Sequence, residues 1–158
     1  MKYSILFFAL IGVSCKVTKE EARVASFAPS TAQIAEHFDA KSEEFFTGIQ
    51  LEKGKVYRIT PQVTESPWDD AGNAADFEGW HDRSGMGGIG GLMTRFQFYP
   101  LYALIGCVDE VVWSKCFKIG NGLSDYQAAH SGELIVFVND VLYFNNNGKA
   151  SITVELSE

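Results

Sequence analysis

Oxygen-bearing side chains gather near the C-terminus, in the segment from Val138 to Gly148. Asp140 contributes a carboxylate there, and Asn145 and Asn146 contribute amide oxygens. One charged and several neutral oxygen donors suit a hard cation such as calcium, which prefers carboxylate, amide and carbonyl ligands to nitrogen or sulfur. The same residue types also form plain hairpin turns, because Asn and Gly tolerate positive φ. The segment therefore predicts either a Ca2+ site or an ordinary turn.

A second group of acidic residues lies in the long irregular stretch from 65 to 91. Its members are Asp69, Asp70, Asp76, Glu78 and Asp82. Paired carboxylates hydrolyse glycosides when two acids stand at a fixed separation across the scissile bond. Nothing in the sequence fixes that separation, and acids scattered through a loop are most often solvated. No Ser–His–Asp or Cys–His arrangement is distinguished either, so the sequence favours a protein that is not an enzyme.

The tryptophans Trp68, Trp80 and Trp113 have rings that could stack on the CH faces of sugars. Each could equally belong to the core, which is the commoner place for a large aromatic side chain. Trp80 is followed by the polar pair His81 and Asp82 within the irregular stretch, which is long enough to favour a functional loop. The sequence leaves both roles open.

The composition is that of one folded domain. The chain has 158 residues, of which 46% are hydrophobic and 21% charged, with twelve Phe, six Tyr and three Trp. This balance is typical of globular rather than disordered proteins, and the length suits a single core. The net charge of -7 argues against a nucleic-acid partner, because phosphate binding needs a basic face.

The N-terminus has the pattern of an export signal. Lys2 supplies one positive charge, and the apolar run from 4 to 13 is about half of the ~20 residues that a membrane span needs. Gly12-Val13-Ser14-Cys15 resembles a bacterial lipobox, which implies cleavage before Cys15 and acylation of that residue. An ordinary secretory signal is the alternative. We therefore expect residues 1–14 to be a lipoprotein signal peptide, and the mature protein to be exported and held by this lipid anchor at the outer membrane or cell surface.

Residues 15–41 are expected to form a polar tether before the folded domain. Ile34, Ala35 and Phe38 have helical spacing within it, which predicts a short helix from 31 to 39. Residues 42–158 then form the domain itself.

The domain reads as a series of short strands separated by turn signals. Residues 45–51 and 56–60 flank a polar glycine turn and predict a hairpin. In residues 94–99 and again in 151–156, apolar and polar side chains alternate as in a half-buried strand. Residues 134–138 are apolar on both faces and predict a central strand. Such a pattern, with few helix signals, favours an all-β sandwich of the jelly-roll type.

Cys107 and Cys116 are the two cysteines of the expected domain. Each lies in a strand-like segment, and adjacent strands bring Cα atoms to the separation that a disulfide requires. Disulfides persist in exported proteins, so a pair is predicted, with two buried free thiols as the alternative. A zinc site is not indicated, because the histidines are scattered and no CxxC spacing occurs.

Several segments, taken together and in order, resemble the bacterial calcium-dependent galactose-binding lectins, the galactophilic type. The matching pieces are Thr47 to Gly54, Ala103 to Gly106, Phe117 to Gly122, Ser131 to Leu134, Val138 to Asp140, Asn145 to Gly148 and Ser151 to Val154. The resemblance covers most of the expected domain. It implies a galactose-binding-domain-like β-sandwich that binds glycans without catalysis.

The resemblance also implies roles for particular residues. Asp140 becomes the charged ligand of Ca2+, and Asn145 and Asn146 become side-chain oxygen ligands. Asp140 and Asn145 would also touch the sugar, helped by the backbone at Val141. The loop is shorter than in the galactose-binding prototype and lacks its threonine carbonyl ligand. Either Leu142 or Tyr143 replaces that ligand or the metal shell is incomplete.

The prototype's sugar-specificity loop has no clear counterpart, and His81 and Asp82 are its nearest candidates. Calcium that accepts six to eight oxygens has room for vicinal sugar hydroxyls in place of water. Several copies on one surface, or a homo-oligomer, would gain by avidity. The alternative is a structural or protein-binding surface lipoprotein that keeps the fold without metal or sugar.

Overall fold

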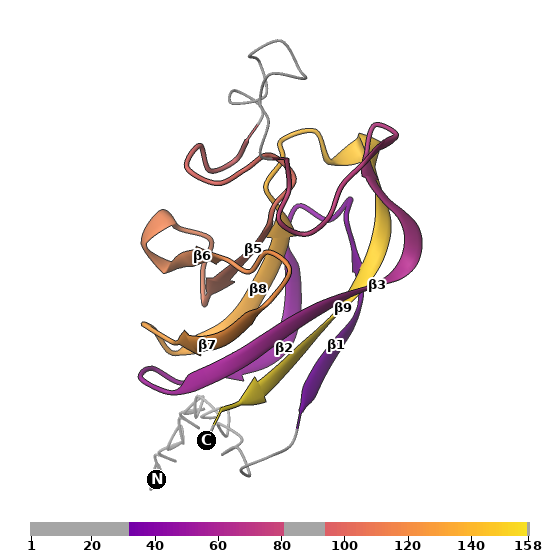
Figure 1. Cartoon of the computed structure of the whole chain (residues 1–158). Helices are drawn as coiled ribbons and strands as arrows, with labels where there is room; N and C mark the ends of the chain where they lie inside the picture. Colours follow the sequence, from indigo (N-terminus) through magenta and orange to yellow (C-terminus); the bar gives the residue numbers. More distant parts are fainter. Residues whose placement is uncertain (1–31, 81–93, 158) are drawn as a thin grey trace, which may run out of the picture.

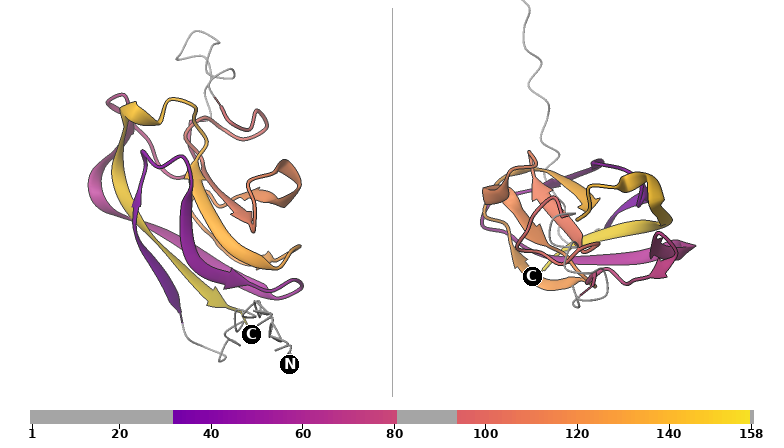
Figure 2. Two further views of the ribbon diagram at one scale, coloured as in Figure 1. Left: turned by 180° about the vertical axis from the view of Figure 1, so that it is seen from behind. Right: turned by 90° about the horizontal axis from the view of Figure 1, so that it is seen from above.

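The protein is a β-sandwich, seen in a computed structural model that describes residues 32–80 and 94–157. Two antiparallel sheets face each other across one core (Figures 1 and 2). The strands are β1 (Gln33–Asp39), β2 (Phe45–Leu51), β3 (Val56–Asp70), β4 (Asn73–Ala74), β5 (Leu104–Val108), β6 (Cys116–Lys118), β7 (Leu123–Gln127), β8 (Gly132–Val138) and β9 (Asn146–Leu156). Two 3₁₀ helices, η3 (Trp113–Lys115) and η4 (Tyr143–Asn145), precede β6 and β9. The expected all-β sandwich is confirmed.

The first sheet has the strand order β1-β9-β3-β4, and β7 also pairs with β3. The long strands β3 and β9 run together over most of their length, from the pair Tyr57–Leu156 to the pair Asp70–Asn146. This register brings the end of β3 beside the start of β9. Residues far apart in the sequence therefore meet at one end of the sandwich.

The second sheet has the order β2-β8-β5-β6. Strands β5 and β8 lie in its centre, and every residue of β5 is buried. The expected central strand at 134–138 is thus confirmed. Cys107 of β5 lies opposite Cys116 of β6, and their sulfurs form a disulfide.

The core between the sheets is built from alternate residues of the facing strands. Its largest fully buried members include Phe38, Leu51, Tyr57, Ile59, Tyr102, Leu104, Leu134 and Ile152. Burial of such side chains stabilises the fold by about 1.5–3 kcal/mol each. A second, smaller cluster of Ala103, Ile105, Cys107 and Phe137 lies with Phe96, Tyr99, Val111 and Cys116 packed against it.

The helix predicted for 31–39 is wrong, because 33–39 is strand β1, paired with β9. A register shift lies between Ala35 and Phe38, and His37 inside it has φ 67°. The irregularity turns Ala35 and Phe38 to the same, buried side although they are three residues apart. The β-bulge therefore imitates helical spacing. The sandwich accordingly begins within the expected tether, before residue 42.

The strands predicted at 45–51 and 56–60 are confirmed as β2 and the first part of β3, but their pairing as a hairpin and the strand predicted at 94–99 are wrong. Strands β2 and β3 do not form a hairpin but lie in different sheets, since Gly54 and Lys55 between them bond to Ala128 after β7. Residues 94–99 form turns rather than a strand, because the Asn139 side chain takes the backbone groups that a neighbouring strand would have paired.

The last predicted strand, 151–156, is confirmed as part of β9. No helix in the described part of the chain is long and apolar enough to cross a membrane.

Candidate functional site

The loop from Asp140 to Asn146 joins β8 to β9 and holds all three predicted metal ligands. Asp140 is only 2% exposed. Its Oδ1 accepts hydrogen bonds from the backbone N–H groups of Val141 (2.6 Å) and Leu142 (2.9 Å). The chain thus folds around its own carboxylate at the start of the loop, as Asp does in turns, and the acid is fixed in place.

The two asparagines at the other end of the loop are fixed through their amide nitrogens. Asn145 Nδ2 donates to Asp70 Oδ1 at 2.7 Å, and Asn146 Nδ2 donates to the carbonyl of Ala40 at 3.1 Å. Each amide nitrogen donates to a protein oxygen, which fixes the orientation of the amide. The amide oxygen on its other side can then accept another partner.

Three side-chain oxygens of this loop are buried without a hydrogen-bond partner among the described residues. They are Asp140 Oδ2, Asn145 Oδ1 and Asn146 Oδ1. A buried polar atom left unpaired costs about 1–3 kcal/mol, and native proteins contain few of them. The three atoms are the side-chain oxygens of the predicted calcium ligands, and carboxylate and amide oxygens are what Ca2+ binds. The residues present therefore fit a hard cation.

Asp70, at the end of β3, adds a second carboxylate to this site. Burial, together with the negative charges of Asp140 and Asp69, raises the pKa of Asp70 to about 6, against the lowering effect of its bond from Asn145. Like charges held close together raise a carboxyl pKa in this way. A divalent cation would relieve the same repulsion.

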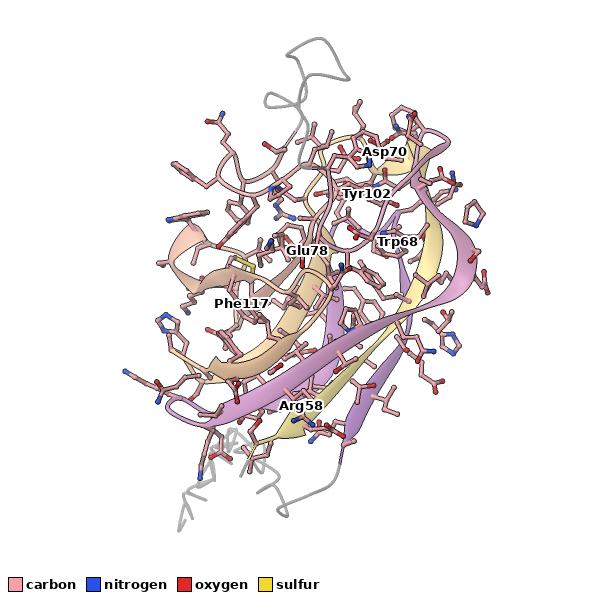
Figure 3. The ribbon with its side chains drawn as sticks, viewed as in Figure 1. Arg58, Trp68, Asp70, Glu78, Tyr102 and Phe117 are labelled. Carbon is pink, nitrogen blue, oxygen red and sulfur yellow. A yellow bond between two sulfur atoms is a disulfide. The ribbon has the colours of Figure 1, made fainter. Side chains whose placement is uncertain are left out.

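Neighbouring side chains brace the acidic end of the sandwich. Asp69 Oδ1 accepts from Asn147 Nδ2 (2.9 Å) and from the N–H of Gly72 (2.8 Å). The buried Tyr102 hydroxyl donates to the carbonyl of Asp69 at 2.7 Å. Figure 3 shows Asp70 at this end, with Tyr102 and Trp68 below it. The end of β3 and the start of β9 are thus held as one unit.

A second set of contacts holds the other side of the loop. Arg95 interacts with the Tyr143 hydroxyl and lowers its pKa, although burial outweighs this effect and raises the pKa overall. Arg95 also pairs with Glu44 and lies over the ring of Phe137. The loop before β9 is therefore tied to segments on both sides of it.

The remaining predicted site residues have different outcomes. Val141 is half exposed beside the predicted ligands, and its backbone N–H donates to Asp140. The carbonyls of Leu142 and Tyr143 each accept a backbone hydrogen bond within the turn. His81, Asp82 and Cys15, the residue predicted to be lipidated, lie outside the described residues.

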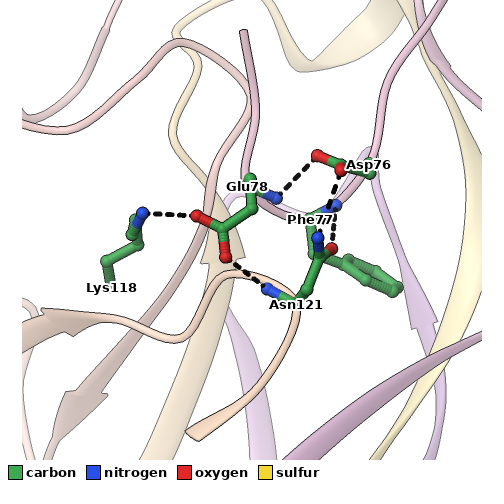
Figure 4. A network of polar contacts seen from close by, with 5 residues as sticks. All are labelled: Asp76, Phe77, Glu78, Lys118 and Asn121. Carbon is green, nitrogen blue, oxygen red and sulfur yellow. Dashed lines mark hydrogen bonds and ion pairs between the residues drawn. The ribbon is translucent and has the colours of Figure 1, made fainter. Parts of the chain in front are cut away.

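Two other described acids of the irregular stretch, Asp76 and Glu78, do not join the loop. Asp76 and Glu78 form a separate network with Lys118 and Asn121, shown in Figure 4. Asn121 also accepts from the N–H of Phe77 at 3.2 Å. This network ties the segment after β4 to the turn between β6 and β7, which is a structural role.

Asp70 is the site residue whose role the sequence did not reveal. It was visible only as one of several loop acids, whereas the structure places it in β3, paired with Asn146 of β9. Among the described residues no group of three His, Cys, Asp or Glu side chains is placed to hold a metal. A cation here would therefore need the asparagine oxygens as well.

Comparisons with known proteins bear on the fold. No protein-family model and no curated protein matches the sequence. Among solved structures, the chain is similar to one described as the EclA N-terminal domain, a PllA-like lectin. The two are 20% identical with a TM-score of 0.52, and the match covers 80% of this chain and 95% of that chain. At this identity the likeness shows that the two proteins share a lectin-type β-sandwich.

Proposed function

We propose that this protein binds glycans through a calcium ion held by the loop between β8 and β9, without catalysing a reaction. The observation that carries the proposal is the set of three buried, unpartnered oxygens of Asp140, Asn145 and Asn146. The lectin-type fold shared with the PllA-like lectin domain supports the glycan as ligand.

The chain's own residues would divide the work. Asp140 Oδ2, Asn145 Oδ1 and Asn146 Oδ1 would hold the ion, and Asp70 would add negative charge beside them. Bound calcium offers coordination positions that sugar hydroxyls can take from water. Val141, which is half exposed, lies next to Asp140, where it would contact the same sugar.

The fixed geometry of the loop favours this role. Asp140 is held by two backbone donors, and both asparagine nitrogens are engaged before any ion arrives. A site arranged in advance loses little conformational entropy on binding.

We further propose that the protein acts at the outer membrane or cell surface through a lipid on Cys15. Copies anchored side by side would bind a multivalent glycan with greater avidity than one site alone.

The test is thermal unfolding of the purified protein with millimolar calcium and with chelator. A ligand at about a hundredfold over its Kd adds ~2.7 kcal/mol to the native state, so calcium should raise Tm. The substitution Asp140→Ala should abolish the shift, whereas Asp125→Asn, which removes an exposed carboxylate from β7, should leave it unchanged. An unchanged Tm of the wild type in calcium would refute the metal site.

Glycan binding is tested separately on an array of immobilised galactosides and other glycans. We expect wild-type binding in calcium that chelator and Asp140→Ala both remove. Binding to proteins but to no glycan would favour the alternative role of a protein-binding surface lipoprotein.

A further inference from the structure

Four aromatic rings gather on the outer side of the second sheet, and we call them the aromatic surface. Its members are Phe96, Phe98, Tyr99 and Trp113. The Trp113 ring lies at its centre, with centroid distances of 5.0 Å to Phe98, 5.4 Å to Tyr99 and 5.6 Å to Phe96. Phe98 is 80% exposed and Trp113 is 48% exposed.

The exposure distinguishes Trp113 from the other two tryptophans. Trp68 is 5% exposed and belongs to the core, and Trp80 packs partly buried against it. Trp113 instead lies on η3, a turn that has no buried residue. Large aromatic rings are usually buried, because burial stabilises them. A cluster that leaves such rings in solvent indicates an interaction site.

The rings are held by a rigid support. Asn139 is fully buried, accepts from the N–H of Phe96 (2.8 Å) and donates to the carbonyls of Tyr99 (3.1 Å) and Pro100 (3.0 Å). On the other side, Trp113 comes just before Cys116, which the disulfide joins to β5. The Tyr99 hydroxyl donates to the carbonyl of Cys116 at 3.3 Å, which connects the two halves.

The charges around the aromatic surface limit what it can bind. Lys115 forms ion pairs with both Asp109 (3.0 Å) and Glu110 (2.8 Å), so its positive charge is already balanced and an excess negative charge remains. The whole chain also carries a net charge of -7. Anionic lipid and nucleic acid are therefore repelled. The charges therefore favour a neutral ligand with an apolar face, and the CH face of a pyranose ring is such a surface.

We propose that the aromatic surface is a second, calcium-independent glycan contact, in which Trp113 stacks on the CH face of a neutral sugar ring with Phe98 and Tyr99 beside it. The proposal takes its ligand class from the proposed function but does not depend on the metal. Asn139, which supports the rings, directly precedes Asp140, so both contacts are built on the end of β8.

The experiment measures glycan binding with calcium removed. Wild-type protein is applied in chelator to an array of neutral oligosaccharides, and the affinity for the best-bound one is followed by tryptophan fluorescence and calorimetry. We expect Trp113→Ala to weaken this binding about tenfold and Phe98→Ala somewhat less, with Trp113→Phe retaining part of it. The matched control Phe46→Ala removes another exposed ring, 59% exposed on β2, and should change nothing.

The two glycan contacts fail in different ways. Asp140→Ala should keep the calcium-independent binding, and Trp113→Ala should keep the calcium-dependent part. Absence of neutral-glycan binding by the wild type in chelator would overturn the aromatic contact and leave the calcium proposal standing. So would equal affinity of Trp113→Ala and wild type. Sedimentation that shows a dimer dispersed by Trp113→Ala would assign the surface to self-association, which also overturns the proposal.

Discussion

Replacing Asp70 with Asn, a side chain of nearly the same size without the charge, should stabilise the calcium-free protein. Burial and the charges of Asp140 and Asp69 raise the pKa of Asp70 from 3.8 to about 6. A carboxyl whose pKa is higher in the folded state destabilises that state when it ionises. This destabilisation is absent below about pH 4, grows as the pH rises, and is complete above about pH 6.

The pKa change sets the size of the effect. Each unit corresponds to about 1.4 kcal/mol, so the full shift would give about 3 kcal/mol. Solvent screening near the surface reduces this, and we expect Asp70→Asn to be about 1–2 kcal/mol more stable than wild type at pH 7. The new amide keeps an oxygen for the bond from Asn145.

The assay is urea unfolding at several pH values from 4 to 7, in chelator and in calcium. In chelator the variant's advantage should grow from near zero at pH 4 to its full value above pH 6. In saturating calcium this advantage should be largely cancelled, because loss of the second carboxylate weakens cation binding by about tenfold, which corresponds to about 1.4 kcal/mol. Asp125→Asn, at an exposed position of β7, serves as the control. The electrostatic argument would be refuted if the variant were less stable than wild type in chelator at pH 7. It would also be refuted if the difference in stability between the two did not change with pH.

Three further predictions follow from the supports of the two sites, each measured by urea unfolding. Asn139→Ala should lower the free energy of unfolding by about 3 kcal/mol, because it leaves partly buried backbone groups of 96–100 without their partner. A loss below about 1 kcal/mol would contradict this. Gly148→Ala should lower the free energy of unfolding by about 2–4 kcal/mol, because φ is 106° and a Cβ would lie 2.7 Å from a backbone oxygen of β3. The control Gly54→Ala has open space around the new Cβ and should lower it by only about 1 kcal/mol. The double change of Cys107 and Cys116 to Ala should lose about 2–3 kcal/mol through a more disordered unfolded chain, and reduction of the wild type should reproduce that loss.

The fold class could be predicted from sequence because alternation and turn residues are local signals. The central strand at 134–138 and the closing strand at 151–156 follow the period of two directly. Local signals failed where the chain departs from regular pairing. The bulge at His37 made β1 look helical, and the side chain of Asn139 replaced a partner strand for 94–99.

The candidate site could be predicted only in part for a related reason. Asp140, Asn145 and Asn146 lie close together in the sequence, so their oxygens are visible as a group. Asp70 reaches them through the pairing of β3 with β9, a contact between residues more than seventy positions apart. A pairing between such distant residues leaves no pattern in the local sequence. The carbonyl of Ala40, which fixes Asn146, enters the site in the same way.

The energetics of the loop connect its folding to the proposed ion. Each of the three unpartnered oxygens destabilises a metal-free loop by about 1–3 kcal/mol, and the total is a large part of the 5–15 kcal/mol by which a typical domain is stable. A loop that served only as a turn would avoid this destabilisation by exposing the oxygens to water. Here the amide nitrogens of Asn145 and Asn146 and the backbone bonds to Asp140 hold the oxygens inside instead. Calcium would turn this destabilising arrangement into a stabilising one, which is why we expect the loop and the ion to be thermodynamically linked.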